Sequence, residues 1–429
     1  MSYVVAVRSE IMELQNERLR ALIKRVWDCS PFYKRRLASM GISPDSIRTT
    51  DDLKRIPFTT KTDLRDNYPL GLLSVEKSEL LRFHVSSGTT GNPTVVAYTS
   101  NDIANWAELN ERCLRLAGVT PEDVVQVAYG YGLFTGGLGL HYGAERLGSK
   151  VIPASTGNTK RQLKLMKDLG TSVVACTPSY GLFLAESAQD EGIDAKRDLK
   201  LRVGIFGAEP WSETTRALLE EKLVGSAYDI YGMSELNGPG VAMECKEKDG
   251  LHIWEDNYIV EVIDPKTGEV LEPGERGEMV VTTIMKEGMP LLRYRTRDMT
   301  ILDNSQCRCG LAHARIKRIT GRTDDMLKVR GICVFPSQIE EVLTSIDGVS
   351  PHYQLVIERD GALDKLMVRV EIAGSFKTDR LNDLVTLQRR IEDELKEVLS
   401  VNASVELMEP KKIPRSEGKA QRIVDLRKI

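Results

Sequence analysis

Apolar residues recur at helical spacing in the first part of the chain. Ile11, Leu14, Leu19, Leu22 and Val26 follow one another at such intervals within residues 8–40, which predicts an amphipathic helix. Helical spacing of apolar residues and capping residues predict three further helices. A short one follows the capping residues Thr50–Asp52, and the other two cover 58–69 and 102–117.

Between Val124 and Ile230, short apolar runs alternate with helical patterns. The predicted strands are 124–129, 151–152, 172–176, 201–206 and 227–230, and the predicted helices are 139–147, 160–169, 179–191 and 212–223. This alternation is typical of a parallel, doubly wound sheet. Ligands bind at the carboxyl ends of such strands, so the loops after Tyr129, Phe206 and Ile230 are candidate site loops.

The pattern changes after residue 250. Short β-like segments are expected at 258–264, 269–271, 277–284 and 299–303. A smaller unit begins at Gly321. Its predicted helices are 336–346 and 378–399, and its predicted strands are 353–358, 365–372 and 404–408. The fold class is therefore α/β: a large N-terminal domain with doubly wound sheets plus a β-rich subdomain, and a small α+β C-terminal domain. We expect the polar tail KKIPRSEGKAQRIVDL to be mobile.

Composition narrows the class of protein. The 429 residues include 59 basic and 62 acidic side chains, a balance that does not favour a nucleic-acid or acidic-membrane binder. We find no apolar run long enough to cross a membrane and no signal-peptide core at the start. Seven cysteines, most of them isolated, fit a reducing compartment. We therefore expect a soluble cytoplasmic protein.

The stretch HVSSGTTGNPTVVAY (84–98) is rich in small and hydroxylated residues. Glycines let backbone N–H groups approach an anion closely, and the hydroxyls add further donors. The stretch is not a Walker P-loop, because Asn92 stands where that motif has lysine. A phosphate-binding loop and an ordinary surface turn remain equal alternatives.

The loops Gly207-Ala208-Glu209-Pro210 and Tyr231-Gly232-Met233-Ser234-Glu235 each follow a predicted strand. Tyr231 can stack on a base, and Glu235 can hold Mg²⁺ through a carboxylate oxygen. The alternative is a common strand-to-helix turn with an acidic helix start.

Two further stretches carry candidate site residues. YGYGLFTGGLGLHYG (129–143) predicts an apolar pocket lined by Tyr129, Tyr131 and Phe134, with glycines making room for a flat ring, although these aromatics are equally typical of ordinary core. RYRTRD (293–298) ends in Asp298, which can accept hydrogen bonds from ribose hydroxyls, and a solvated charge run is the alternative.

Four soft-metal ligands are Cys245, His252, Cys307 and Cys309, and together they can form a tetrahedral zinc site. His313 competes as the fourth ligand, and reduced buried thiols are the alternative. Lys419, in PRSEGK, is either a solvated charge or a group that bridges a substrate carboxylate and an α-phosphate.

The order of these motifs resembles the adenylate-forming superfamily of acyl-CoA synthetases, luciferases and peptide-synthetase adenylation domains. The motifs are SSGTTGNPT, GAEP, YGMSE, RYRTRD, GRTDDMLKVRG and PRSEGKAQRI. Within the superfamily, FTTKTDLRDNYP, YGLFTGGLG, GPGVAMEC and VFPSQIEE are similar to the phenylacetate–CoA ligase branch. The resemblance runs nearly from end to end.

The resemblance implies a role for each matching position. ATP phosphates would be bound by Ser86, Ser87, Gly88, Thr89, Thr90, Gly91 and Ser234, and Mg²⁺ by Glu235. Adenine would be surrounded by Ala208, Glu209, Pro210, Asp229, Ile230, Tyr231, Gly232 and Met233, and the ribose would be bound by Asp298 and Arg322. The aryl pocket would be lined by Tyr129, Tyr131, Phe134, Gly207, Ala208, Ile230 and Pro239, while the hinge would be Asp324, the coenzyme A half-reaction would use Lys328 and Gly331, and adenylation would use Lys419. It also implies an adenylation domain over 1–323 and a mobile C-terminal domain over 324–429.

The implied activity is ATP-dependent ligation of an arylacetic acid to coenzyme A through an acyl-adenylate, with release of AMP and pyrophosphate. Lys419 and Glu235 would be catalytic, relatives suggest a homodimer, and some relatives use the cysteine–histidine set for zinc. Asn92 replaces a lysine common in the family, so we expect weaker ATP binding and an active enzyme. The main alternative is adenylation of an acceptor other than coenzyme A, such as a deazaflavin cofactor; a nucleotide-binding sensor is more distant.

Overall fold

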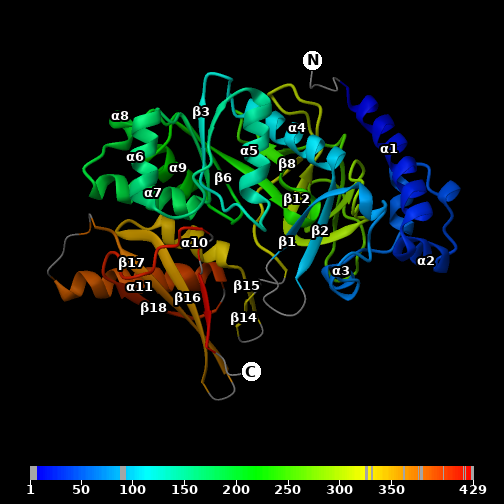
Figure 1. Ribbon diagram of the computed structural model, residues 1–429. Coiled ribbons are helices and arrows are strands. Elements are labelled where there is room, and N and C mark those ends of the chain that lie inside the picture. The colour runs from blue at the N-terminus through cyan, green and yellow to red at the C-terminus, as the bar shows by residue number, and fades with distance from the viewer. Residues whose placement is uncertain are drawn as a thin grey trace.

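The chain opens with two helices where the sequence predicts one (Figure 1). The computed structural model describes residues 7–86, 93–323, 327–329, 332–360, 363–374, 376, 380–399, 401–418, 420 and 422–426. Helices α1 (Arg8–Cys29) and α2 (Pro31–Ser39) meet at Ser30. Pro31 has no N–H to continue the first helix, and it is favoured as the first residue of the next. The predicted amphipathic helix at the start of the chain is confirmed over Arg8–Cys29, and the helical pattern over 8–40 divides into two helices.

The expected helix over 58–69 is shorter than predicted. Only α3 (Lys61–Asp66) forms, and it begins where the Thr60 side chain accepts a hydrogen bond from the Asp63 amide. Three turns of 3-10 helix surround it in the sequence: η1 (Pro44–Ser46), η2 (Thr50–Arg55) and η3 (Lys77–Glu79).

One eleven-stranded sheet runs through the large domain in the order β10-β11-β12-β13-β9-β8-β7-β6-β5-β3-β4. The parallel half contains β3 (Val124–Val127), β4 (Lys150–Ile152), β5 (Val173–Cys176), β6 (Val203–Gly207) and β7 (Ser226–Met233). The antiparallel half contains β8 (Gly238–Glu244), β9 (Leu251–Ile253), β10 (Tyr258–Ile263), β11 (Arg276–Thr283), β12 (Tyr294–Asp303) and β13 (Arg315–Ile316). The predicted parallel α/β topology is confirmed, and the β-rich part continues the same sheet.

Helices cover both faces of the parallel half because the strand order reverses. The connection from β3 to β4 runs outward and the later connections run back across the sheet, so right-handed crossovers put their helices on opposite faces. Helices α4 (Ser100–Leu116) and α5 (Gly136–Leu147) share one core with β3, whereas α6 (Thr159–Leu169), α7 (Pro178–Asp190), α8 (Ala195–Asp198) and α9 (Glu213–Lys222) supply or adjoin a second core on the other face.

A separate hairpin brackets the hydroxyl-rich loop. Strand β1 (Leu80–Ser86) pairs antiparallel with β2 (Thr94–Thr99), and Ser86 lies opposite Thr94. The residues between the strands, 87–92, lie outside the described part of the chain.

The small C-terminal unit has its own core. Its elements are the hairpin β14 (Leu327–Val329) and β15 (Ile332–Val334), helix α10 (Pro336–Ser345), strands β16 (Val349–Asp360) and β17 (Leu363–Ile372), helix α11 (Leu381–Leu399), and strands β18 (Ala403–Met408) and β19 (Ile423–Asp425). Four strands form a sheet in the order β18-β17-β16-β19. The predicted boundary at 323/324 stays a prediction.

The end of the chain is held in this sheet. Strand β19 pairs in parallel with β16 over Leu355–Ile357, and Ile413 is buried. The expectation of a mobile tail is wrong for the described residues, because apolar side chains such as Ile423 pack on the domain core.

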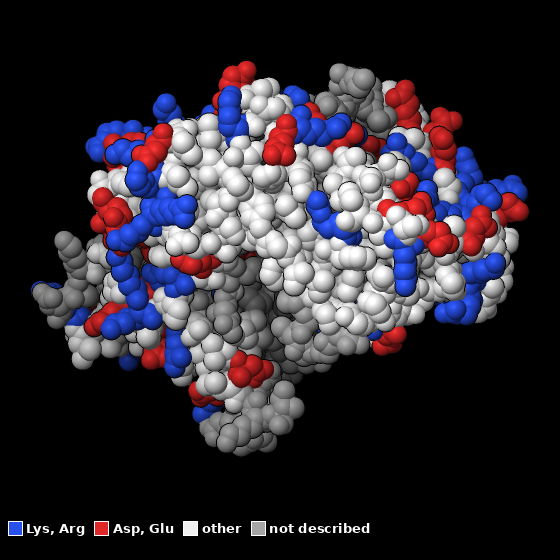
Figure 2. All heavy atoms as spheres, in the orientation of Figure 1, with Lys and Arg blue, Asp and Glu red and all other residues white. Residues whose placement is uncertain are grey.

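Charged side chains lie mainly around the rim of the face shown in Figure 2, and the surface over α5 and β1 is largely uncharged. Exposed apolar side chains on and beside β1 include Leu81, Phe83, Leu133 and Phe134. Among the described residues, we find no helix that is both long enough and apolar enough to span a membrane.

Candidate active site

The carboxyl ends of β5, β6 and β7 meet at one edge of the sheet, and the small domain lies against this edge (Figure 1). Gly207 ends β6 where a Cβ atom would lie 2.2 Å from the Ile230 carbonyl oxygen, so only glycine allows this close approach of β6 and β7. Ala208 then takes a positive φ of 71°. Ala208 and Pro210 are exposed, which leaves the loop surface open to a ligand.

Three predicted ribose and base residues lie together. Tyr231 Oη donates a hydrogen bond to Asp298 Oδ2 at 2.5 Å, and Arg322 Nη1 lies 3.1 Å from Asp298 Oδ1. Burial and the Asp298 charge raise the pKa of Tyr231 well above its usual value, so the phenol stays a donor. The Asp298 carboxylate is the kind of acceptor that ribose hydroxyls require.

The Ser234–Glu235 turn is held from several sides. It forms η4 (Ser234–Leu236), and Asn237 closes it with a φ of 108°. Ser234 Oγ lies 3.1 Å from Thr135 Oγ1, and Tyr98 Oη donates to the Ser234 carbonyl at 3.3 Å. Gly232 is required nearby, because a Cβ there would lie 2.0 Å from the Gly238 carbonyl oxygen.

Lys286 is a site residue that the sequence analysis missed. Its buried Nζ donates to the Glu235 carbonyl at 3.3 Å and lies 4.5 Å from the centre of the Tyr98 ring. Burial lowers the pKa of Lys286 to about 8, against the opposing charges of Asp102 and Glu235. The lysine lies in an unremarkable loop between β11 and β12, so no sequence pattern marked it.

Glu235 is buried beside a small cavity, and its carboxylate chemistry suits Mg²⁺. The cavity is otherwise lined by apolar side chains: Leu64, Val95, Val96, Met289 and Leu291.

Unpaired hydroxyls mark the base of the predicted phosphate loop. Ser86 Oγ and Thr94 Oγ1 are buried on opposite strands of the hairpin and make no hydrogen bond within the described residues. A phosphate group would supply the acceptors that these hydroxyls lack. The loop positions Ser87, Gly88, Thr89, Thr90 and Gly91, together with Asp324, Gly331, Lys419 and the Lys328 side chain, lie outside the described residues.

The aromatic residues of the predicted pocket have different environments. Tyr129 is buried and its Oη donates to the Cys176 carbonyl at 2.6 Å, whereas Tyr131 Oη lies 3.2 Å from His141 Nδ1 and Phe134 is 51 % exposed. The glycines of α5 make room for helix α4. A Cβ at Gly139 would lie 2.6 Å from the Trp106 ring, and one at Gly143 would lie 2.5 Å from Asn110 Cβ.

The remaining pocket and base residues lie nearby on β7 and β8. Ile230 is buried, Met233 is half-buried, and the Pro239 carbonyl accepts from Trp106 Nε1 at 2.9 Å. Asp229 is buried, and burial together with the Glu244 charge raises its pKa to about 7.

Glu209 makes contacts that the sequence did not predict. Its Oε1 accepts from the Ser179 amide at 2.7 Å, and its Oε2 accepts from the Ala420 amide of the C-terminal tail at 3.1 Å. Thr177, the residue after β5, donates from Oγ1 to the Gly418 carbonyl at 3.0 Å. The run VVACTPS, a buried strand followed by a capping threonine and a proline, is the signal that could have identified Thr177 and Ser179.

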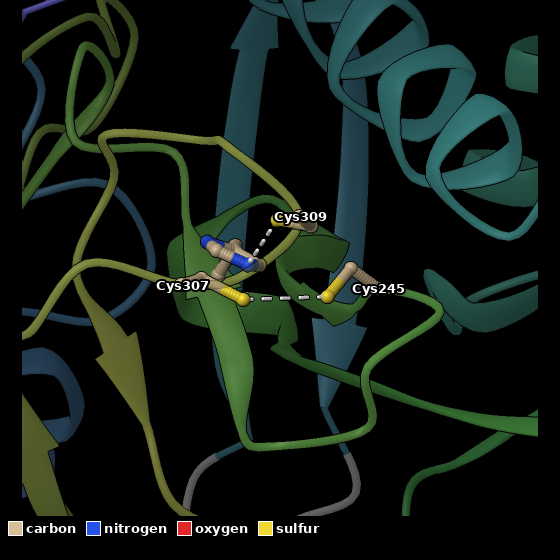
Figure 3. A group of neighbouring side chains, drawn as sticks. Cys245, Cys307 and Cys309 are labelled. Carbon is tan, nitrogen blue, oxygen red and sulfur yellow. Dashed lines mark hydrogen bonds between the residues drawn. The ribbon is translucent and has the colours of Figure 1, made fainter.

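The predicted metal ligands converge (Figure 3). One ligand atom from each of Cys245, His252, Cys307 and Cys309 lies within 4.8 Å of all the others. Cys245 and Cys307 Sγ atoms are 3.7 Å apart, close to the separation of about 3.8 Å expected between sulfurs at 2.3 Å from one tetrahedral zinc ion.

His252, rather than His313, faces this group. His252 Nε2 lies 3.3 Å from Cys309 Sγ, and its Nδ1 lies 3.2 Å from the His313 carbonyl oxygen. A histidine that donates through one ring nitrogen presents the other to a metal, so the donors fit zinc. The His313 Nδ1 instead accepts from the Glu255 amide at 3.3 Å.

Comparisons with known proteins agree with this geometry. Residues 42–285 match the family described as "AMP-binding enzyme", and residues 331–427 match "AMP-binding enzyme C-terminal domain". A phenylacetate-coenzyme A ligase from Thermus thermophilus is 48 % identical over 98 % of this chain and 98 % of its own length.

Two crystal structures of 2-hydroxyisobutyryl-CoA ligase are also similar to the chain, each 30 % identical. The postadenylation state with 2-HIB-AMP covers 98 % of this chain and 91 % of its own, with a TM-score of 0.92. The thioesterification state covers 98 % and 90 %, with a TM-score of 0.72. The arrangement of this chain is thus closer to the first state. By sequence, fold and site, the chain belongs to the AMP-binding enzymes, in the family of phenylacetate-coenzyme A ligases.

Proposed function

We propose that the protein joins an arylacetic acid, phenylacetate or a close analogue, to coenzyme A at the expense of ATP, and releases AMP and pyrophosphate. The observation that carries this proposal is the likeness, over nearly the full length of both chains, to the Thermus thermophilus phenylacetate-coenzyme A ligase. The corner formed by Tyr231, Asp298 and Arg322 supports a nucleotide as the second substrate.

In the first half-reaction, a carboxylate oxygen of the acid bonds to the α-phosphorus of ATP, and pyrophosphate leaves with the electron pair of the broken P–O bond. Asp298 holds the ribose, Tyr231 stacks on adenine, and Ser86–Gly91 and Ser234 donate to phosphate oxygens. Lys419 offsets the negative charge that develops there. Mg²⁺, held by Glu235, supplies further neutralisation when it is bound.

In the second half-reaction, the coenzyme A sulfur bonds to the acyl carbon after its thiol proton is lost to solvent, and AMP leaves. The small domain turns about Asp324 between the two steps, so that Lys328 and Gly331 replace Lys419 at the sheet edge. The aryl group of the acid lies in a pocket lined by Tyr129, Tyr131, Phe134, Gly207, Ala208, Ile230 and Pro239. Zinc at Cys245, His252, Cys307 and Cys309 is structural and takes no part in either step.

The test uses the purified protein with MgATP and a panel of arylacetic acids. We expect pyrophosphate release with at least one acid and AMP formation that requires coenzyme A. Lys419→Ala should lower ATP–pyrophosphate exchange by at least about a hundredfold, while the control Lys412→Ala, an exposed lysine of the same tail, should not. Exchange without coenzyme A-dependent AMP formation would favour another acceptor, and no exchange with any acid would contradict the proposal.

A further inference from the structure

Two residues of the large domain hold the backbone on either side of position 419. Thr177 Oγ1 donates to the carbonyl of Gly418 at 3.0 Å, and the amide of Ala420 donates to Glu209 Oε2 at 3.1 Å. These bonds join parts of the chain that are 241 and 211 residues apart. Only the residue between Gly418 and Ala420 separates the two points of attachment.

The two holding groups stand on a rigid base. Thr177 and Glu209 follow β5 and β6, which are neighbouring parallel strands paired at Cys176 and Phe206. The Thr177 hydroxyl also accepts from the Tyr180 amide at 3.2 Å, as the N-cap of α7. Glu209 is fixed through its other oxygen by the Ser179 amide at 2.7 Å. The side chains of Thr177 and Glu209 are therefore already fixed before they bind the C-terminal tail.

We propose that Thr177 and Glu209 are positioning residues for the adenylation half-reaction: they fix Gly418 and Ala420, the two residues that flank Lys419 in the sequence. This inference rests on the proposed function, in which Lys419 acts at the α-phosphate. It gives the Glu209 carboxylate a different task from the one beside adenine that its motif predicts. Charge-assisted bonds from backbone amides are among the stronger hydrogen bonds, which suits Glu209 to this task.

Both bonds join the two domains, so both must break when the small domain turns for the second half-reaction. The arrangement seen here is the one closer to the postadenylation state of the related ligase. Loss of either bond should therefore slow acyl-adenylate formation and leave thioester formation from a supplied acyl-adenylate unchanged. A residue that served stability alone would affect both half-reactions together.

The test measures the half-reactions separately in Glu209→Gln and Thr177→Val. The glutamine places an NH₂ group against one of the two amides, and the valine keeps the shape of threonine without its hydroxyl. We expect ATP–pyrophosphate exchange to fall about tenfold to a hundredfold, with coenzyme A-dependent consumption of a supplied acyl-adenylate within about twofold of wild type. Thr177→Ser, which keeps the hydroxyl, should restore exchange.

Thr60→Val is the matched control, because Thr60 caps α3 and touches no part of the tail in the described residues. It should lower stability without changing the ratio of the half-reactions. An equal fall of both half-reactions in Glu209→Gln, or a rise in KM for ATP at unchanged kcat, would overturn the positioning role.

A measurement without substrate separates this inference from the proposed function. In the full-length Glu209→Leu protein, whose side chain has no acceptor, hydrogen–deuterium exchange of the peptide containing Ala420 should be at least about tenfold faster than in wild type. An unchanged rate of hydrogen–deuterium exchange would exclude the hydrogen bond between Ala420 and Glu209, even if the enzyme were active. If hydrogen exchange is faster in the variant but the wild-type protein forms no acyl-adenylate, the bond is real and the proposed function is excluded, together with the role of the bond in adenylation.

Discussion

Asp229 is a buried carboxyl group whose charge the fold disfavours. Its Oδ2 is 3.7 Å from Arg318 Nε, and its backbone amide donates to Glu244 Oε2 at 2.7 Å. Burial and the Glu244 charge raise the pKa of Asp229 to about 7, and Arg318 offsets only part of this. The unfolded chain therefore loses this proton at a much lower pH than the folded chain does.

This difference predicts how Asp229→Asn depends on pH. Between the two pKa values the folded chain holds the proton and the unfolded chain does not, so ionisation of Asp229 lowers stability as pH rises toward about 7. The asparagine removes that loss. Its advantage over wild type in the free energy of unfolding should grow by up to about 3 kcal/mol from pH 5 to pH 8, measured by urea denaturation without nucleotide.

Asp123→Asn is the control of opposite sign. Hydrogen bonds from Arg202 and Ser172 outweigh burial and lower the pKa of Asp123 to about 2. Its stabilising contribution is complete above its ordinary pKa and is lost only as pH falls toward about 2. The variant should be less stable than wild type by the same amount at pH 5 and at pH 8. A pH-independent effect of Asp229→Asn would contradict the assignment.

At the residue scale, the sequence predicted which residues belong to the candidate site better than it predicted their hydrogen-bond partners. Tyr231, Asp298 and Arg322 meet as three motifs of one nucleotide site should. The partner of Glu209 could not be predicted, because Ala420 lies on another domain and no local pattern connects the two. Lys286 was missed because a buried lysine in a loop has no sequence signature, and its environment exists only after folding.

At the scale of elements, periodicity predicted the parallel strands and missed structure that depends on pairing. Strand β8 contains the sequence GPGVAME, in which glycine and proline argue against a strand, yet β7 and β9 pair with it on both sides. Strand β7 likewise continues to Met233 through the residues expected to be a loop. Segment 269–271, which was expected to be a strand, forms only a bridge between Val270 and Ile263 at the outer edge of β10.

The proposed zinc would join the end of β8, strand β9 and the loop after β12, at one end of the paired strands β12-β13-β9-β8. Cys245 follows β8, His252 lies on β9, and Cys307 and Cys309 lie in the loop after β12. Cys307→Ser should reduce bound zinc from about one ion per chain to nearly none. We expect the free energy of unfolding to fall by about 4 kcal/mol or more. Native mass spectrometry measures the bound metal, and denaturation measures the stability.

Cys29→Ser is the control for the zinc variant, because Cys29 is exposed and lies outside the cluster. It should keep both the metal and the stability of wild type. Native protein that is purified without chelators and contains no zinc would count against the site.

At the scale of the whole molecule, an ion-pair group outside the proposed active centre also joins the domains. Glu186 on α7 contacts His352 of β16 at 2.6 Å and Arg415 of the tail at 3.0 Å. Burial favours a higher pKa for Glu186, but the hydrogen bonds and charges of His352 and Arg415 outweigh it and lower the pKa to about 2. The Glu186 carboxylate therefore stays charged throughout the physiological pH range, and its stabilising contribution disappears only as pH falls from its ordinary pKa toward about 2.

Glu186→Gln should weaken the association of the two domains. The variant leaves His352 with an uncharged acceptor, and it leaves Arg415 paired with Glu371 inside the small domain, so the small domain should leave its present position more often. We expect the radius of gyration from small-angle X-ray scattering to rise measurably above that of wild type, because a displaced small domain lies farther from the centre of mass. Glu145→Gln, which loses a glutamate–histidine contact inside α5, should not change it.

The likeness to known ligases supports the domain order, whereas the homodimer and the cytoplasmic location stay predictions. Within the described strands, hydrogen bonds run through all eleven members of the large sheet. Because its strands are paired continuously from β10 to β4, we expect access to the strand ends to change through movement of the small domain rather than within the sheet. A compound that wedged between the two facing surfaces would arrest turnover without resembling any substrate, and its selectivity would come from the tail rather than from the nucleotide pocket.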